Sequence, residues 1–430
     1  MIDQTSVLIR DELRDSIEWL SHYGKTPSGG VRRLLYDSAW RKAQHALAEK
    51  WKHMGFSVRF DDVGNLFGRV QGRGTDKQVI LTGSHIDTVI DGGKYDGAYG
   101  ILASMVAVSR LLRKYGTPER SIEVVSLCEE EGSRFPLSFW GSGNLTGKYR
   151  PDLAGHIVDS EGISLLKAMQ DAGFGLGKYS QPERRDIACF LETHIEQGMT
   201  MENRHQVWAP VSHIVGQRRF TITLTGASNH AGTTPMDSRR DTLAAAARMI
   251  AGVSRDAAEM TNGLVATVGR IEAEPNTVNV IPGRCRFSLD IRHHQQSVID
   301  QFSRKLTRFF KKTAEQCHVD IQMDQWMDVS PVRLDPQLLA LNMKLAEEAG
   351  LPCKQMVSGA GHDAQIFGTY CPTSLMFVPS HRGISHAPEE FTRPEDLATG
   401  VRMLMKLLYQ LAWTSEKSGK RVIHNDEKPI

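Results

Sequence analysis

LTGSHIDTVIDGGKYDGAYG, residues 81–100, contains a strand end and a glycine-rich loop around which the rest of the chain is arranged, and it carries the first candidate site. An apolar run from residue 78 leads into small residues and a polar turn, which is the pattern of a buried strand ending near His85. Asp96 follows in a loop rich in glycine, a residue that lets the backbone crowd a site. Imidazole and carboxylate ligands suit zinc, manganese or cobalt better than calcium. A hydrogen-bonded turn is the alternative explanation for this pair taken alone.

Strands and helices alternate on either side of this stretch. Helical patterns at residues 4–22 and 37–54 precede it, residues 99–115 form the next helix, and residues 122–128 and 188–193 have the pattern of buried strands. Such alternation predicts an α/β fold with a mixed, mostly parallel sheet, whose ligands bind at the carboxyl ends of the strands. The acidic run 129–131 follows one strand, and His194 follows another. We therefore expect these groups to converge with His85.

A second domain interrupts this pattern. Residues 219–225 alternate between apolar and polar side chains, and the elements that follow have the order βαββαβ, which is that of a ferredoxin-like unit. We expect an inserted domain at residues 212–329 and a first domain made of residues 1–211 and 330–430. A helix at 336–349, a strand at 373–378 and a helix at 395–413 would resume the α/β pattern. The charged tail from residue 414 is expected to be disordered.

Composition limits the class of protein. A chain of 430 residues is too long for one ordinary core, and 40% hydrophobic with 24% charged residues is typical of a soluble globular protein. The net charge of +2 gives no reason to expect nucleic acid or a membrane as a partner. The N-terminus lacks the apolar core of a signal peptide. Six scattered cysteines without CxxC spacing fit reduced thiols, so we expect a cytoplasmic protein.

Imidazole or carboxylate groups occur at four places along the chain: His85 with Asp96, the acidic run 129–131, His194, and His386. A catalytic metal pair needs about five such ligands, including a bridging carboxylate. These groups lie in motifs that run in order from residue 83 to residue 390: GSHIDTV, GGKYDG, EEEGSRFP, ETHIEQG, SNHAGTTPM, PNTVNVIPG, DIRH, SGAGHDAQIF and GISHAPEE. With them the chain resembles the dinuclear-metal amidohydrolases of the M20 metallopeptidase clan. Within that clan it is similar to the branch of allantoate amidohydrolases, N-carbamoyl-L-amino-acid hydrolases and β-ureidopropionases.

The resemblance implies a site for two divalent metal ions per subunit, manganese or zinc or else cobalt. Asp96 would bridge the two ions. His85 and His194 would bind one ion, and Glu131 and His386 would bind the other.

The resemblance also implies a general base in the acidic run. The family's paired glutamates directly precede a glycine, here Gly132, which favours Glu130 as the base, Glu131 as a ligand and Glu129 as a bystander. An unligated carboxylate beside two cations can take a proton from water and pass it to the departing nitrogen. The family further suggests a cis peptide bond after Asp96.

The remaining site residues are also implied by the resemblance. The inserted domain would be a lid and dimerisation domain, so a homodimer is expected. Its Arg292 would bind the substrate carboxylate, a role suited to a planar bidentate donor; the alternative for Arg292 is an exposed pair with Asp290. The other implied residues are Asn279 at the same end of the substrate, Gln197 at the ureido group, His230 at the oxyanion, and Gly359 and Ala360 with backbone groups in the pocket.

Hydrolysis of the terminal ureido group of allantoate is the activity that the resemblance favours. The products would be ureidoglycine, ammonia and carbon dioxide, which places the reaction in purine (ureide) nitrogen salvage. An N-carbamoyl-L-amino-acid amidohydrolase, which would use the same ligands and base, is the nearest alternative. A non-catalytic dimeric binding protein on the same fold is a remote one, because all five ligand positions and Glu130 are present.

Overall fold

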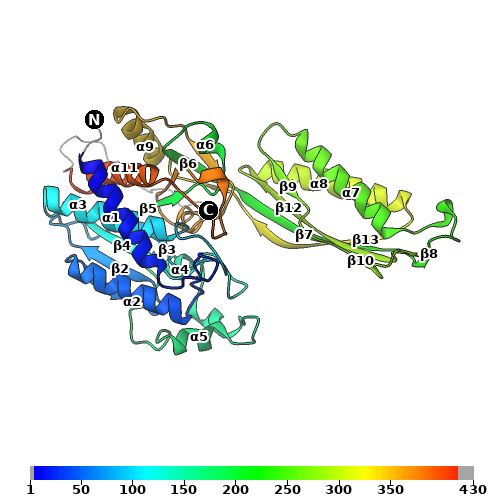
Figure 1. The fold of residues 1–430 in the computed structure, drawn as a ribbon, viewed down its shortest axis with the longest axis horizontal. Coiled ribbons are helices and arrows are strands. Elements are labelled where there is room, and N and C mark those ends of the chain that lie inside the picture. Colours follow the sequence, from blue (N-terminus) through cyan, green and yellow to red (C-terminus); the bar gives the residue numbers. More distant parts are fainter. Residues whose placement is uncertain (1–3, 415–430) are drawn as a thin grey trace, which may run out of the picture. The chain divides into compact units, whose positions relative to one another are not determined.

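The computed structural model of the protein describes residues 4–414. The expected disorder of the tail concerns residues that, from 415 onward, lie outside the described range. The chain divides into two compact units, Met1–Ser212 with Arg333–Ile430 (unit 1) and His213–Val332 (unit 2). Figure 1 shows the elements of both units. Within residues 4–414 no helix is long and apolar enough to cross a membrane.

Unit 1 is built on a large mixed sheet. Its strands are β1 (Ser57–Phe60), β2 (Leu66–Val70), β3 (Val79–His85), β4 (Ser121–Leu127), β5 (Ile187–Ile195), β6 (Ala209–Ile214), β14 (Val332–Arg333), β15 (Met356–Ser358) and β16 (Thr373–Val378). They lie in the order β1-β2-β4-β3-β5-β16-β6-β14, with β15 paired to β6. β4, β3, β5 and β16 are parallel to one another, whereas β1, β2 and β6 pair antiparallel. The expected mixed, mostly parallel core is confirmed.

Unit 1 also contains helices. They are α1 (Gln4–Ser21), α2 (Ser38–His53), α3 (Ala98–Tyr115), α4 (Trp140–Leu145), α5 (Leu165–Asp171), α6 (Thr200–Asn203), α9 (Pro336–Glu348), α10 (Asp363–Phe367) and α11 (Pro394–Ala412), with short 3-10 turns at Pro151–Gly155 and His381–Gly383. α2 begins where the Asp37 carboxylate accepts the Trp40 N–H, and α9 begins at the equivalent cap, Asp335. α3 contacts β3, β4 and β5, and α1 and α11 pack against it.

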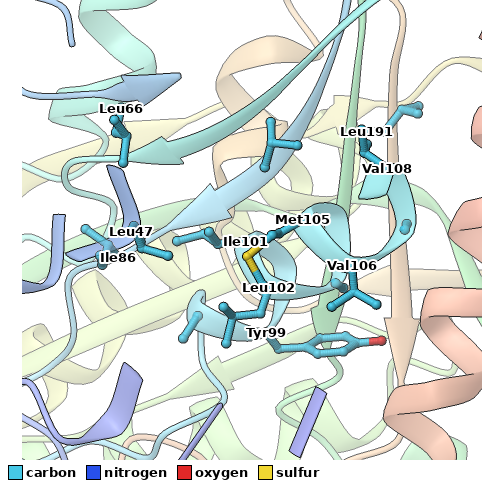
Figure 2. Close-up of a cluster of buried hydrophobic side chains, with 14 of the residues drawn as sticks. Leu47, Leu66, Ile86, Tyr99, Ile101, Leu102, Met105, Val106, Val108 and Leu191 are labelled. Atoms are coloured by element: carbon cyan, nitrogen blue, oxygen red, sulfur yellow. The ribbon is translucent and has the colours of Figure 1, made fainter. Parts of the chain in front are cut away.

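The core of unit 1 lies around α3. This helix is apolar on nearly its whole circumference, as expected of a helix covered on all sides. β3, β4 and β5 are buried along their full length, which explains their continuous apolar runs. Figure 2 shows the packing of Leu47, Leu66, Ile86, Tyr99, Ile101, Leu102, Met105, Val106, Val108 and Leu191. The strand ends that carry the candidate site therefore rest on a rigid, close-packed layer.

Unit 2 is a smaller antiparallel sheet with two helices. Its elements are β7 (Gly216–Thr225), β8 (Asn229–His230), a 3-10 turn (Met236–Ser238), α7 (Thr242–Ala258), β9 (Val265–Thr267), β10 (Ile271–Glu274), β11 (Val280–Ile281), β12 (Arg284–His293), α8 (Gln296–Gln316) and β13 (Asp320–Val329). The sheet order is β10-β12-β7-β13, with β9 on β12. Phe287, Leu289 and Ile291 alternate on the buried face of β12, in one core with residues of both helices. The expected ferredoxin-like unit is confirmed.

Some expected element boundaries differ from the structure. The apolar pattern of residues 264–271 predicts one strand, but the structure has two short strands there, β9 and β10. The pattern of residues 277–292 predicts a strand interrupted by Pro282-Gly283, and this interruption is present between β11 and β12. α4, whose sequence WGSGNL contains two glycines, is not among the helices that the sequence pattern predicts. Close packing accounts for a glycine at position 141, because a Cβ there would lie 2.9 Å from the backbone nitrogen of Cys128.

Candidate metal centre and active site

Three parallel strands bring the candidate ligands to one edge of the unit 1 sheet. His85 ends β3 and is paired with Leu127, the last residue of β4, so the acidic run 129–131 follows immediately beside it. His194 lies near the end of β5, opposite Phe377 of β16. Since the carboxyl ends of parallel strands meet at one edge, these groups converge as the sequence pattern predicted.

His85, Asp96 and His194 form one buried group. Nε2 of His85 lies 3.4 Å from Oδ1 of Asp96, and Nε2 of His194 lies 3.2 Å from the same oxygen. Nδ1 of His194 donates to the Ile195 carbonyl at 2.9 Å, and Nδ1 of His85 lies 3.2 Å from Oδ1 of Asp87. These partners place the ring proton on Nδ1, so the lone pair of each Nε2 faces the Asp96 carboxylate.

Asp96, Glu131 and His386 form a second group that shares Asp96 with the first. Nε2 of His386 lies 3.3 Å from Oδ2 of Asp96 and 3.5 Å from Oε1 of Glu131. Within each group the ligand atoms all lie within 4.8 Å of one another. Oδ1 of Asp96 is buried and has no hydrogen-bond donor among the described residues. Three imidazole nitrogens and a glutamate oxygen that converge on one buried aspartate form a donor set that fits a pair of divalent cations.

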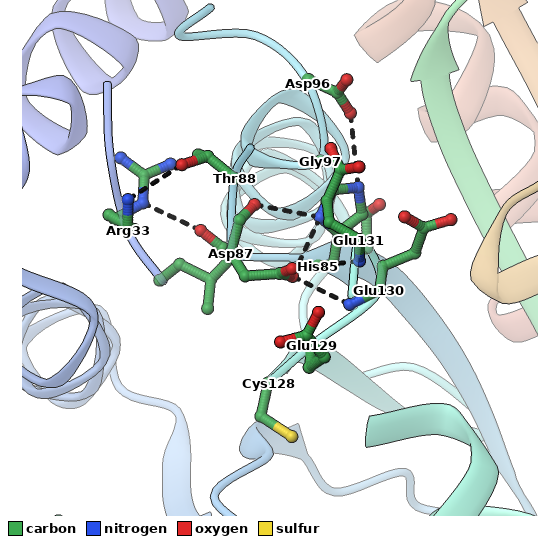
Figure 3. A network of polar contacts seen from close by, with 12 residues as sticks. Arg33, His85, Asp87, Thr88, Asp96, Gly97, Cys128, Glu129, Glu130 and Glu131 are labelled. Carbon is green, nitrogen blue, oxygen red and sulfur yellow. Dashed lines mark hydrogen bonds and ion pairs between the residues drawn. The ribbon is translucent and has the colours of Figure 1, made fainter. Parts of the chain in front are cut away.

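Asp87 holds the acidic run in place. Its carboxylate accepts the backbone N–H of Glu130 at 2.9 Å and that of Glu131 at 3.1 Å, as Figure 3 shows. Glu130 and Glu131 also form a third group with His85. The Glu129 carboxylate instead accepts the N–H of Gly132 and is fully buried. The three consecutive acids therefore occupy different environments.

Burial and mutual repulsion control the charge of these carboxyl groups. Burial, with repulsion from Glu131, raises the pKa of Glu130 well above its usual value despite the nearby His85. Burial, with repulsion from Asp96, raises the pKa of Glu131 to about 8. Burial opposes the ionised form of Asp96 as well, but in the metal-free protein the protonated imidazoles of His194, His386 and His85 donate to this carboxylate and hold its pKa well below the usual value. Bound divalent cations would favour the ionised form of every one of these carboxyl groups.

Gln197 and His386 meet at the open side of the site with strained backbones. Both have positive φ, 57° and 58°, which is uncommon for residues other than glycine. The side-chain amide of Gln197 donates to Oδ2 of Asp96 at 2.8 Å, and its Oε1 has no partner within the described part of the chain. His386 is half-exposed. The site is therefore accessible from this side.

The loop before α10 contacts the site through His362. Gly359 is exposed and Ala360 is half-buried, and the Ser358 hydroxyl donates to the Ala360 carbonyl at 2.8 Å. The buried His362 ring packs edge-on against His194, with 4.6 Å between the ring centroids. The next residue, Asp363, accepts the Ser142 hydroxyl at 2.5 Å.

The other candidate residues lie in unit 2. His230 is exposed, and its Nδ1 accepts the N–H groups of Gly232 at 3.1 Å and Thr233 at 3.2 Å, which leaves the proton on Nε2. Asn279 is its neighbour, because the Ala231 N–H donates to the Asn279 carbonyl at 3.0 Å.

Arg292 lies at the other end of β12, where its guanidinium donates to both oxygens of Asp290 at 3.1 Å. The pairing that the sequence offered as an alternative for this arginine is thus present.

One expectation is wrong, and one contact was missed. Among residues 4–414 the cis peptide lies at Glu274–Pro275, so the bond after Asp96 is trans; Gly97 makes the turn there with φ 62° instead. The missed contact is that of Glu390, whose carboxylate accepts the backbone N–H of Asp96 at 3.1 Å. It lies in the motif GISHAPEE, but acidic residues in a loop are usually solvated, so the sequence carried no signal for it.

Comparisons with known proteins find relatives that align with nearly the whole chain. The allantoate amidohydrolases of Bacillus subtilis (strain 168) and Escherichia coli (strain K12) are 47% and 45% identical to the chain, over 96% and 94% of it and 100% and 98% of their own lengths. An N-carbamoyl-L-amino acid amidohydrolase of Geobacillus stearothermophilus is 35% identical over 91% of the chain and 96% of its own length.

Solved structures show the same likeness. The crystal structure of an amidase of the hydantoinase/carbamoylase family from Burkholderia multivorans matches with a TM-score of 0.88 and 34% identity, over 93% of this chain and 97% of that one. The model of peptidase family M20/M25/M40 matches residues 81–410, which contain both candidate metal groups. On this match and these likenesses, the chain belongs to peptidase family M20/M25/M40.

Proposed function

We propose that this protein is a metal-dependent amidohydrolase that cleaves the terminal ureido group of allantoate. The observation that carries the proposal is the near full-length likeness to two allantoate amidohydrolases, at 47% and 45% identity, on a chain that brings five ligand side chains together. The products are ureidoglycine, ammonia and carbon dioxide. The relative that acts on N-carbamoyl-L-amino acids is more distant, at 35% identity.

Two divalent ions, manganese or zinc or else cobalt, are the proposed cofactors. His85 and His194 would hold one ion, Glu131 and His386 would hold the other, and Asp96 would contact both. The two groups of candidate ligands, which share Asp96, support this arrangement. When bound, such a pair polarises the carbonyl group and lowers the pKa of water.

Glu130 is the proposed general base. Its carboxyl group lies with His85 and Glu131, within reach of both metal groups, while its backbone is held by Asp87. In its ionised form it takes a proton from the attacking water and passes it to the nitrogen that leaves the ureido carbonyl. The bond between the ureido carbonyl carbon and this nitrogen then breaks. The nitrogen remains on ureidoglycine, and the released carbamate decomposes to ammonia and carbon dioxide.

The proposed substrate contacts come from both units. In unit 1, Gln197 would bind the ureido group, because its Oε1 has no partner among the described residues. Gly359 and Ala360 would offer backbone groups. In unit 2, His230 would stabilise the oxyanion, since its Nε2 carries the proton. Arg292 would exchange Asp290 for the substrate carboxylate, and Asn279 would bind the same end of the substrate.

A homodimer is the proposed assembly. Arg292 lies eight residues beyond Arg284 along β12, a span of about 26 Å at the usual rise of a strand. His230 and Asn279 lie beyond the other end, where the Gly226 N–H donates to the Gly283 carbonyl at 2.8 Å and β8 pairs with β11. One small ureido molecule cannot contact both ends, so the two ends would serve the active sites of different subunits.

Ammonia release from allantoate by metal-stripped protein, reloaded in turn with manganese, zinc and cobalt, tests this proposal. Turnover that requires metal and is absent in Glu130→Gln is the expected result. Turnover of an N-carbamoyl-L-amino acid without turnover of allantoate would keep the chemistry and replace the substrate. Inactivity on both substrates with every metal would contradict the enzyme assignment and leave the binding-protein alternative.

A further inference from the structure

The Glu390 carboxylate links two segments that are distant in sequence by hydrogen bonds. Its Oε1 accepts the backbone N–H groups of Tyr95 and Asp96, both at 3.1 Å, and its Oε2 accepts the Ser385 hydroxyl at 2.9 Å. Oγ of Ser385 also lies 3.3 Å from Oδ2 of Asp96. A single buried carboxylate therefore contacts the backbone of one candidate ligand and the chain neighbour of another, His386.

The surrounding chain is shaped to receive this carboxylate. The Glu390 N–H donates to the Ala387 carbonyl at 3.1 Å, so residues 387–390 form a turn that directs the side chain back toward Ser385. Gly93 lies against the carboxylate, because a Cβ there would be 2.1 Å from Oε1 of Glu390. Only 4% of Glu390 is exposed. A buried carboxylate with three donors is a built contact rather than a solvated surface acid.

Apart from Asp96, which both metal groups share, the contacts of Glu390 lead only to the second group, through Ser385 beside His386. His85 and His194 are oriented by Asp87 and by the Ile195 carbonyl, which are not contacts of Glu390. The hydrogen bonds of Glu390 instead reach Asp96 itself and Ser385, the chain neighbour of His386. His386 is half-exposed and has a positive φ, so its own loop gives it little support.

We propose that Glu390 is a positioning residue that holds Asp96 and His386 in register and so selectively supports the ion site formed by Asp96, Glu131 and His386. The inference rests on the proposed two-ion function and adds to it a residue that contacts no ion. Outer hydrogen-bond partners of metal ligands typically change metal affinity by about 10- to 100-fold when they are removed.

Zinc titration of the metal-stripped full-length protein, by calorimetry and by metal analysis after dialysis, tests this inference. In Glu390→Ala one of the two binding events should weaken about 10- to 100-fold while the other stays unchanged. The retained event should match that of His386→Ala, which keeps the His85 group, and not that of His85→Ala. Glu390→Gln should restore both events, because its oxygen still accepts the two N–H groups and its amide donates to Ser385.

Two further variants keep the test decisive. Glu389→Ala, at an exposed neighbour in the same turn, is the matched control and should bind zinc as the wild type does. Ser385→Ala removes the hydroxyl that contacts both Glu390 and Oδ2 of Asp96, leaves the two backbone contacts of Glu390 intact, and should weaken the same event if Glu390→Ala fails to fold. Equal weakening of both events, or of neither, would overturn the role of Glu390. Wild-type protein that binds fewer than two ions would instead overturn the two-ion proposal on which it rests.

Discussion

At the scale of single residues, the acidic run 129–131 places three identical side chains in three environments. Glu129 is turned to the Gly132 N–H, whereas Glu130 and Glu131 are grouped with His85. The Asp87 carboxylate accepts the backbone N–H groups of Glu130 and Glu131. The side chains of these two residues therefore cannot exchange places without the loss of two buried hydrogen bonds. Glu130 and Glu131 are thereby fixed in different positions, as their proposed roles of general base and metal ligand require.

Glu130→Gln should lower kcat by about 10²- to 10⁴-fold, because the amide keeps the shape of the side chain but cannot take a proton. Metal content should remain that of the wild type, measured on the same samples. Glu389→Gln, at an exposed acid, is the control and should keep full activity. A Glu130→Gln enzyme that retains more than a tenth of wild-type kcat would exclude Glu130 as the base.

Metal affinity should increase with pH up to about 9. Without metal, hydrogen bonding to Asp96 raises the pKa of His386 to about 9, and burial raises that of Glu131 to about 8. Both groups are protonated below these values and must lose the proton to bind a cation, so acid competes with metal. Calorimetry at pH 7 in buffers of different ionisation enthalpy should report net proton release. Affinity that is constant between pH 6.5 and 9 would contradict this picture.

At the scale of elements, α3 packs against both β3 and β5, the strands that carry His85 and His194. Its Gly100 is the point of closest approach: a Cβ there would lie 2.4 Å from the Thr193 carbonyl oxygen and 2.6 Å from Cβ of Ser84. Thr193 and Ser84 directly precede the two histidines. The position of α3 and the spacing of these ligands are therefore coupled.

Gly100→Ala should reduce the free energy of unfolding by about 1–3 kcal/mol. Alanine favours a helix over glycine by about 1 kcal/mol, but forcing a methyl group into this contact outweighs that gain. Urea denaturation measures the change. Gly155→Ala is the control, because no neighbouring atom lies within 4 Å of its Cβ position, and it should change stability by less than about 0.5 kcal/mol. Equal effects of the two substitutions would show that the close approach is not energetically important.

At the scale of the whole molecule, the proposed dimer assigns the two ends of the unit 2 sheet to different active sites. Mixing two inactive variants tests this directly. Glu130→Gln would be combined with His230→Ala in one mixture and with Arg292→Ala in another. If the two ends serve different subunits, one mixture and not the other should regain activity, up to about a quarter of the wild type, because half of the dimers then carry one intact site.

The assembly itself should have a mass twice the 47.9 kDa of the chain, measured by light scattering during size-exclusion chromatography. A mass of one chain would contradict the dimer. Recovery of activity in both mixtures, or in neither, would contradict the assignment of the two ends to different subunits.

Much of the fold and of the ligand set follows from the sequence alone. The buried strands before His85, Glu129 and His194 are continuous apolar runs, and the alternation of β12 identifies its buried face, because these periodicities are local. The motif order from residue 83 to residue 390 predicted the family that the family match and the relatives confirm. The candidate ligands could be named because strand ends and glycine-rich loops are visible along the chain.

Contacts between individual side chains depend on the tertiary structure. Asp96 faces three imidazoles, Asp87 accepts backbone N–H groups of the acidic run, and Glu390 contacts both Asp96 and Ser385. The residues in these contacts lie up to 294 positions apart in the sequence. The short helix α4, which contains two glycines, and the trans peptide bond after Asp96 also depend on neighbours in space. Sequence periodicity reports the face that an element buries, but the packing of distant elements sets the distance between two side chains.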